Sequence, residues 1–184
     1  MKLIVAVTGA SGITYALSFL RATKKHGIET HLIVTDSAKK VASHEIGDIQ
    51  QLTSLADHVY APDEMSAKIA SGSYNVDGMV IVPSSMKTIA ALANGFADNL
   101  VTRAADVQLK ERRKLIIVPR ETPLHAVHLE NMAKLSQLGA VILPAMPGFY
   151  HRPESIDDLV DFISGKILDQ LGVENSLYTR WGSA

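Results

Sequence analysis

The fold of this chain is decided by residues 3–12, which read Leu3-Ile4-Val5-Ala6-Val7-Thr8-Gly9-Ala10-Ser11-Gly12. The apolar run that opens this stretch is typical of a strand buried on both faces of a parallel sheet. Gly9 and Gly12 allow a tight turn, and a helical pattern begins directly after it. A strand, a glycine-rich turn and a helix in this order favour an anion, usually a phosphate, near the hydroxyl of Ser11. The spacing differs from the dinucleotide fingerprint G-x-G-x-x-G, so a tight turn without a ligand is the alternative.

The composition is that of an ordinary soluble α/β protein. The chain has 184 residues, 47% of them hydrophobic, a net charge of −1 and no cysteine, which excludes disulfides and thiol nucleophiles. It has no apolar run of the ~18 residues that a membrane span needs and no secretion signal, so a cytoplasmic location is expected. Without long runs of one charge sign, nothing favours binding to nucleic acid or to a membrane.

Apolar runs alternate with helical patterns along the rest of the chain. We expect strands at 3–7, 30–34, 78–82, 115–118 and 140–143, and helices at 14–26, 39–45, 99–113, 124–138 and 155–171, with another beginning at 84. Residues 57–65 are expected to be irregular, and 66–70 to form a short helix. Pro83 is expected to stop the third strand, and 173–184 to form an irregular tail. The alternation predicts one α/β domain over 1–184, with a three-layer, doubly wound parallel sheet of Rossmann-like or flavodoxin-like type.

Polar and charged residues gather at the predicted carboxyl ends of the strands, where doubly wound sheets bind their ligands. Hydroxyls and N–H groups at several strand ends can hold one phosphate. Arg120 can clamp a phosphate, and the neighbouring Glu121 can transfer a proton, although an ordinary surface ion pair is the alternative. The residues at these ends are Ser11, Thr35, Ser84, Ser85, Arg120, Glu121 and the loop around Tyr150.

The seven histidines predict no metal site, because none falls in an H-E-x-x-H pattern or another tight metal spacing. His125 and His128 are three residues apart, but no acidic partner stands obviously beside them. A Ser–His–Asp hydrolase is disfavoured as well, since the chain has no G-x-S-x-G elbow.

Longer motifs follow one another along nearly the whole chain. They are GASG at 9–12, VPSSMKT at 82–88, RAADV at 103–107, LKERR at 109–113, VPRETPL at 118–124, HLENM at 128–132, PAMPGFYHRP at 144–153 and RW at 180–181. In this order they closely resemble the UbiX-type flavin prenyltransferases, which older descriptions call aromatic acid decarboxylase subunits.

This resemblance implies a transferase that binds reduced FMN and dimethylallyl phosphate without a metal. Members of the family join the prenyl group to N5 and C6 of the flavin, and the prenylated FMN serves UbiD-type decarboxylases. Ubiquinone synthesis and aromatic acid breakdown are both open as the pathway served. The family also implies a large homo-oligomer, expected to be a dodecamer, with sites shared between subunits.

The resemblance also implies roles for individual residues. Ser11 and Glu45 would handle protons around N5, with Lys110 and Glu121 as further catalytic residues. The implied FMN contacts are Gly9, Ala10, Ser11, Thr35, Ser85, Met86, Lys87, Thr88 and Arg120. The implied contacts to the prenyl phosphate are Arg103, Lys110, Arg120, Glu121, Tyr150 and Lys166, and Trp181 would help to close the site.

Two positions depart from the commoner family pattern. Ser84 stands where many members have cysteine, and Lys166 stands where several have arginine. Lysine keeps the positive charge of arginine but lacks its planar, forked guanidinium group.

Two other functions share the fold and FMN: a flavoprotein that decarboxylates a cysteine end, and a non-catalytic FMN carrier. The first lacks support because the Asn-containing motif and catalytic His of such enzymes are not found here. The second leaves the basic cluster of Lys110 and Arg120 unexplained.

Overall fold

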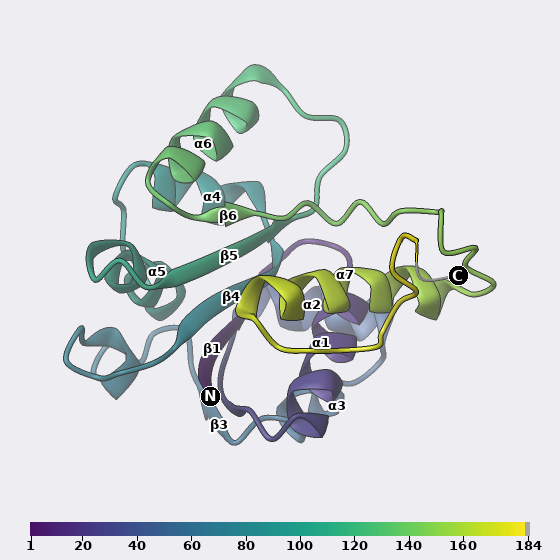
Figure 1. Cartoon of the computed structure of the whole chain (residues 1–184). Coiled ribbons are helices and arrows are strands. Elements are labelled where there is room, and N and C mark those ends of the chain that lie inside the picture. The colour runs from purple at the N-terminus through teal and green to yellow at the C-terminus, as the bar shows by residue number, and fades with distance from the viewer. Residues whose placement is uncertain (183–184) are drawn as a thin grey trace.

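The protein is organised around one six-stranded parallel sheet with the strand order β3-β2-β1-β4-β5-β6 (Figure 1). The computed structural model describes residues 1–182. The last two residues of the expected tail, 183–184, lie outside the described part. The strands are β1 (Lys2–Val7), β2 (Glu29–Val34), β3 (His58–Tyr60), β4 (Gly78–Ser84), β5 (Lys114–Pro119) and β6 (Val141–Ile142).

Helices cover both faces of the sheet, so the predicted three-layer, doubly wound fold is confirmed (Figure 1). One face carries α1 (Ile13–Lys25), α2 (Asp36–Glu45), α3 (Gln50–Thr53) and α7 (Ile156–Leu171). The other carries α4 (Met86–Ala93), α5 (Leu100–Lys110), α6 (Ala126–Gln137) and the short 3₁₀ helix η1 (Lys68–Ala70).

Strand β1 shows why the opening stretch decides the fold. Its side chains alternate between the two layers: Leu3, Val5 and Val7 pack under α1 and α7, while Ile4 and Ala6 pack under α4 and α5. All five are fully buried. A strand with both faces buried needs apolar residues at every position, which is the pattern of the sequence.

The prediction of five strands was wrong, because residues 57–65 contain β3. This edge strand has only three residues, two of them exposed, so it lacks an apolar run that a sequence pattern can detect. It is held by parallel pairing with β2, which a local pattern does not report. The four-residue helix α3 was missed in the same region.

The predicted end of the third strand was also wrong, because β4 continues through Pro83 to Ser84. Pro83 offers no N–H to a neighbouring strand, and the β4–β5 register shifts between Ile81 and Ser84. The Pro83 carbonyl instead accepts hydrogen bonds from the N–H and the hydroxyl of Thr8 at the end of β1.

Other boundaries move by a few residues. Helix α2 begins at Asp36 because the Thr35 side chain caps it, α5 ends at Lys110, and β6 keeps only two residues. The predicted caps of α7, Ser155 and Gly172, are confirmed. Within residues 1–182, no helix is both long enough and apolar enough to cross a membrane.

The strand order creates a switch point between β1 and β4. The chain leaves β1 toward β2 and β3, and later returns to the other side of β1 as β4 and β5. Loops that follow two such strands run in opposite directions, which opens a crevice at their carboxyl ends. The fold therefore places the residues after Val7 and after Ser84 at the edge where a ligand binds.

Candidate functional site

Hydrogen bonds tie three strand ends together at the switch point. The Thr8 hydroxyl donates to the Pro83 carbonyl at 2.9 Å and accepts from the Ser85 N–H at 2.8 Å. The Thr35 N–H donates to the Val7 carbonyl at 3.1 Å. The ends of β1, β2 and β4 are thus fixed relative to one another.

A polar cavity of about 180 Å³ lies at these strand ends. Three helices begin at its wall, capped by the side chains of Thr35, Ser85 and Asn99. Helix N-termini and hydroxyls together favour an anion such as a phosphate. The cavity is lined by Thr8, Gly9, Thr35, Ser37, Ser85, Lys87, Thr88, Ala91, Asp98, Asn99 and Thr102.

Gly9 is required in this cavity because the chain passes very close to α2. A Cβ added at Gly9 would lie 2.4 Å from the Cβ of Ser37, which is closer than real side chains approach. Five of the predicted FMN contacts, Gly9, Thr35, Ser85, Lys87 and Thr88, line this one cavity.

The first turn of α1 does not have the free N–H groups that the sequence suggested. The Glu45 carboxylate, at the end of α2, accepts from the Gly12 N–H at 3.0 Å and from the Ile13 N–H at 2.7 Å. A phosphate at this position would compete with Glu45 for these donors. The expected anion site at this turn is therefore taken by a protein carboxylate, which binds the N–H of Gly12, the residue after Ser11.

Arg120 joins this turn to a second hollow. Its Nε donates a hydrogen bond to the Ser11 carbonyl at 3.1 Å. Burial raises the pKa of Tyr15, and the positive charge of Arg120 offsets part of this rise. Arg120, Glu121 and Met86 line a largely apolar groove of about 430 Å³ that runs along α6. Ser11, Glu45, Arg120 and Glu121 thus form a continuous polar strip next to an apolar groove.

Tyr150 and Lys166 both adjoin a cluster of aromatic rings on α7 and the tail. The Tyr150 ring lies 5.9 Å from Phe162 and 5.4 Å from Trp181, while Lys166 Nζ lies 5.9 Å from the centre of the Tyr178 ring. Phe162 and Tyr178 are 4.8 Å apart and connect the two sides.

Asp169 anchors the tail to α7, a role that the sequence did not reveal. Its carboxylate accepts hydrogen bonds from Tyr178 at 2.5 Å, Arg180 at 2.7 Å and Asn175 at 2.9 Å. Burial and this carboxylate raise the pKa of Tyr178 to about 12. Burial alone would raise the pKa of Asp169, but the donors outweigh it and hold that pKa below its usual value.

Arg103 and Lys110 do not join the other site residues within one chain. Arg103 donates to the Ala70 carbonyl and pairs with Asp106, and Lys110 pairs with Glu111 beside Gly72. Helix α5 starts at the cavity and carries Lys110 about 16 Å away, at ~1.5 Å per residue. Within one chain, Lys110 therefore lies at the opposite end of α5 from the cavity.

Several cavity residues were not predicted from the sequence. No role is predicted for Thr8, although it makes the bonds that fix the switch point. Asn99 and Thr102 form the capping box of α5, and this N-x-x-T signal was available. Ser84, predicted at a strand end, is fully buried at the end of β4.

Comparisons with known proteins agree with this geometry. Residues 1–168 match a protein-family model described as Flavoprotein. The chain is 52% identical to the flavin prenyltransferase UbiX of Methanothermobacter thermautotrophicus, over 97% of this chain and 94% of that protein.

Two solved structures are similar over nearly the whole chain. One is described as a dodecameric FMN-dependent UbiX-like decarboxylase from Escherichia coli O157:H7, with a TM-score of 0.96, 45% identity, and coverage of 98% and 99% of the two chains. The other is AnUbiX (PadA1) in complex with FMN and dimethylallyl pyrophosphate, with a TM-score of 0.96, 42% identity, and coverage of 98% and 97%. The peptidyl-cysteine decarboxylase EpiD, at 22% identity and a TM-score of 0.61, shares the fold alone.

The Asp169 anchor predicts a specific response of the tail. In Asp169→Asn, the neutral amide no longer balances Arg180, so the tail should loosen, and the fluorescence anisotropy of Trp181, the chain's one tryptophan, should fall. The lowered pKa means that the carboxylate contributes stability above the ordinary carboxyl pKa of ~3.9 and loses it as the pH falls through the lowered value. Wild type should therefore show an acid change in Trp181 emission below about pH 4 that the variant lacks.

Asp157→Asn, on the exposed first turn of α7, is the matched control and should behave like wild type. Equal anisotropy in wild type and Asp169→Asn would show that the tail is held by other contacts.

Proposed function

We propose that this chain, which belongs to the UbiX-type flavin prenyltransferases of the Flavoprotein family, is itself a flavin prenyltransferase. It transfers a dimethylallyl group from dimethylallyl phosphate to N5 and C6 of reduced FMN. The observation that carries the proposal is the arrangement at the switch point. A phosphate cavity of hydroxyls and helix N-termini adjoins the strip of Ser11, Glu45, Arg120 and Glu121. A carrier of FMN needs only the first of these two features.

The cavity fits the phosphate end of FMN. Hydroxyls of Ser37, Ser85 and Thr88 and the ammonium of Lys87 line it, and Gly9 leaves room for close approach of the backbone. At about 180 Å³ it is smaller than the ~300–1,000 Å³ usual for whole ligand sites. Ser11, Arg120 and the apolar groove would hold the remainder of FMN. When bound there, FMN supplies the nucleophilic N5 and C6 positions.

Ser11 and Glu45 are placed to manage protons beside the flavin. Glu45 is held by the N–H groups of Gly12 and Ile13, which fix the position of its carboxylate. The Gly12 N–H that binds Glu45 directly follows Ser11 in the chain, so two groups that can transfer protons, a carboxylate and a hydroxyl, stand at this turn. The same hydrogen bonds prevent Glu45 from turning away when a substrate enters.

The reaction needs positive charge to stabilise the leaving phosphate. It also needs the aromatic cluster to keep water away from the prenyl group. Arg120 and Lys166 supply charge that stabilises a departing phosphate without a metal. Tyr150 and Trp181 offer ring faces that favour the positive charge developing on the prenyl group.

The complete site requires more than one copy of the chain. Lys110 and Arg103 lie on α5, apart from Arg120 in the same chain, and large apolar side chains are exposed near the tail. Phe149 is 71% exposed and Trp181 82%, which is typical of surfaces that bury against a partner. We infer a homo-oligomer, a dodecamer as in the similar E. coli structure, in which a neighbouring subunit supplies Lys110 and Arg103. The product serves a UbiD-type decarboxylase, and the protein acts in the cytoplasm.

Mass spectrometry of the flavin tests the proposed activity directly. Incubation with reduced FMN and dimethylallyl phosphate should add the mass of one prenyl group to the flavin, with dimethylallyl diphosphate run in parallel. A cysteine-end decarboxylase or a carrier would leave the flavin mass unchanged.

Glu45→Gln should keep FMN binding, since its amide oxygen still accepts a hydrogen bond, but prenylation should slow by ~100-fold or more because the proton-transfer group is lost. Glu121→Gln in the same assay tests the second carboxylate, and an unchanged rate in Glu45→Gln would leave Glu45 as a helix cap only.

Lys166 tests the proposed phosphate contact. Lys166→Ala should raise the KM for dimethylallyl phosphate and lower kcat/KM by about one to two orders of magnitude, equivalent to ~1.5–3 kcal/mol for a charge-assisted contact, with FMN affinity nearly unchanged. Lys166→Arg should retain most activity because the charge is kept. Lys25→Ala, on the exposed end of α1, is the control for loss of a surface charge. Wild-type kinetics in Lys166→Ala would make this residue a surface lysine.

A further inference from the structure

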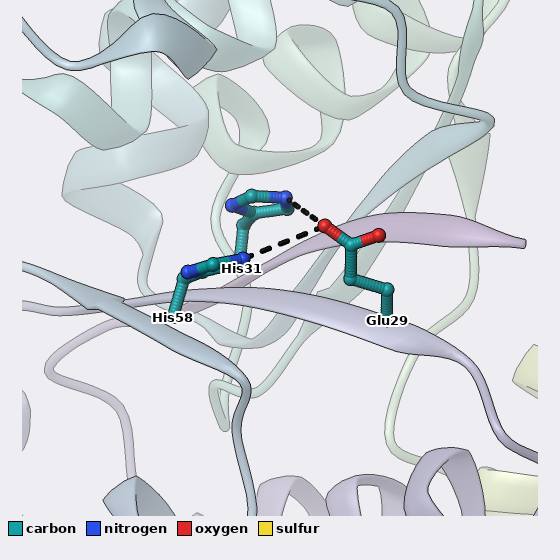
Figure 2. Close-up of side chains that lie close together, drawn as sticks. All are labelled: Glu29, His31 and His58. Carbon is teal, nitrogen blue, oxygen red and sulfur yellow. Dashed lines mark hydrogen bonds and ion pairs between the residues drawn. The ribbon is translucent and has the colours of Figure 1, made fainter.

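Glu29, His31 and His58 form a second cluster of polar side chains, at the outer edge of the sheet (Figure 2). Glu29 and His31 are two residues apart on β2, so their side chains share one face. His31 is the cross-strand partner of His58 on β3. Parallel pairing therefore brings His58, from another strand, to Glu29 and His31, which is why the spacing of the histidines predicted no metal site.

The three groups converge on one point. His31 Nε2 lies 3.2 Å and His58 Nε2 3.5 Å from the same oxygen, Oε1 of Glu29, and the three ligand atoms all lie within 4.8 Å of one another (Figure 2). Ligand atoms ~2.0–2.1 Å from a tetrahedral Zn²⁺ are ~3.3 Å from each other. Two of the three separations already have this value. The third closes by rotation of His58, whose ring stacks on that of His31 with centroids 4.5 Å apart and whose side chain is 44% exposed at the sheet edge.

A second layer of contacts orients His31 for such a role. The ring is fully buried, and its Nδ1 lies 2.9 Å from the Tyr60 hydroxyl, which leaves Nε2 directed at Glu29. A hydrogen bond at one ring nitrogen that directs the other toward the ion is the usual arrangement of a metal-binding histidine. The same Nε2 also lies 3.2 Å from the Tyr74 hydroxyl, which accepts a hydrogen bond from Lys2 Nζ, so an ion bound at Nε2 would replace this contact.

Two lysines also face the cluster and limit what it can bind. Lys2 Nζ lies 3.7 Å from Glu29 Oε1 and Lys68 lies over the Tyr74 ring. A dication would have to displace Lys2, whose side chain is already 31% exposed and can turn to solvent. Magnesium and calcium prefer oxygen ligands, so two imidazoles and one carboxylate select instead for a transition metal.

We propose that Glu29, His31 and His58 form a binding site for Zn²⁺ or a similar transition-metal dication, which joins the edge strand β3 to β2. The site is separate from the proposed reaction. Glu29 begins β2, whereas Thr35, at the opposite end of that strand, lines the phosphate cavity about 20 Å away at ~3.3 Å per residue. The ion would act as a clip on a strand that has only three residues of its own.

Titration with Co²⁺ tests this proposal, because tetrahedral Co²⁺ absorbs visible light strongly and reports the geometry of its ligands. Tag-free wild-type protein should bind one Co²⁺ per chain with tetrahedral absorption, and Zn²⁺ should displace it and raise Tm. Glu29→Gln and His58→Ala should lose this absorption and the Tm rise, and Tyr60→Phe should weaken binding by about 10-fold, as for other second-layer partners. His44→Ala removes an exposed histidine elsewhere and should leave binding unchanged.

Both mutated ligands are partly exposed, so the variants should fold, and their Tm without metal provides the check. Absorption of the octahedral type, or Co²⁺ binding that is equal in wild type and His58→Ala, would overturn the proposal. Glu29 and the two histidines would then be joined only through hydrogen bonds. Prenylation by the metal-free protein at the wild-type rate is expected in either case, so failure of this site would not bear on the proposed enzyme activity.

Discussion

The hydroxyl of Thr8 is the interaction on which the rest of the site depends. It is almost completely buried and joins β1 to β4 by donating to Pro83 and accepting from Ser85. Each buried group left without a partner costs about 1–3 kcal/mol, so the arrangement is strongly specified. The Ser85 that it fixes is the N-cap of α4, and the start of α4 forms one wall of the phosphate cavity. One side chain thus connects the sheet, the switch point and the ligand site.

The direction of α5 imposes a second constraint, which concerns assembly. Because this helix begins near the carboxyl edge of the sheet and ends before β5 starts, Lys110 lies at its far end, away from the cavity. Under the proposed function, Lys110 meets the phosphate held by Arg120 when chains come together. The exposed aromatic residues of the tail and of the 144–153 loop are consistent with such contacts. On this account, oligomerisation is a condition for catalysis.

The parts of the fold that could be predicted from the sequence are those with a local signal. Residues 3–7 of β1 are all apolar because both faces of the strand are buried. Thr35, Ser85 and Ser155 indicate helix starts because their hydroxyls cap the helices that follow. The parts that were missed depend on distant partners. Strand β3 exists through its pairing with β2, and Pro83 stays in β4 because Thr8 meets its carbonyl. The roles of Asp169 and of the pair His31 and His58 could not be predicted, because they depend on partners that only the fold brings close.

The central claim is that FMN is held in the cavity at the ends of β1, β2 and β4, and a double-mutant cycle of FMN affinity tests it most directly. Gly9→Ala places a Cβ against that of Ser37, so it should weaken FMN binding by at least ~10-fold in the wild-type background. In a Ser37→Gly background the obstructing Cβ is gone, and adding Gly9→Ala should change the affinity little. FMN affinity that is unaffected by Gly9→Ala in a folded protein would place the flavin elsewhere and contradict the account.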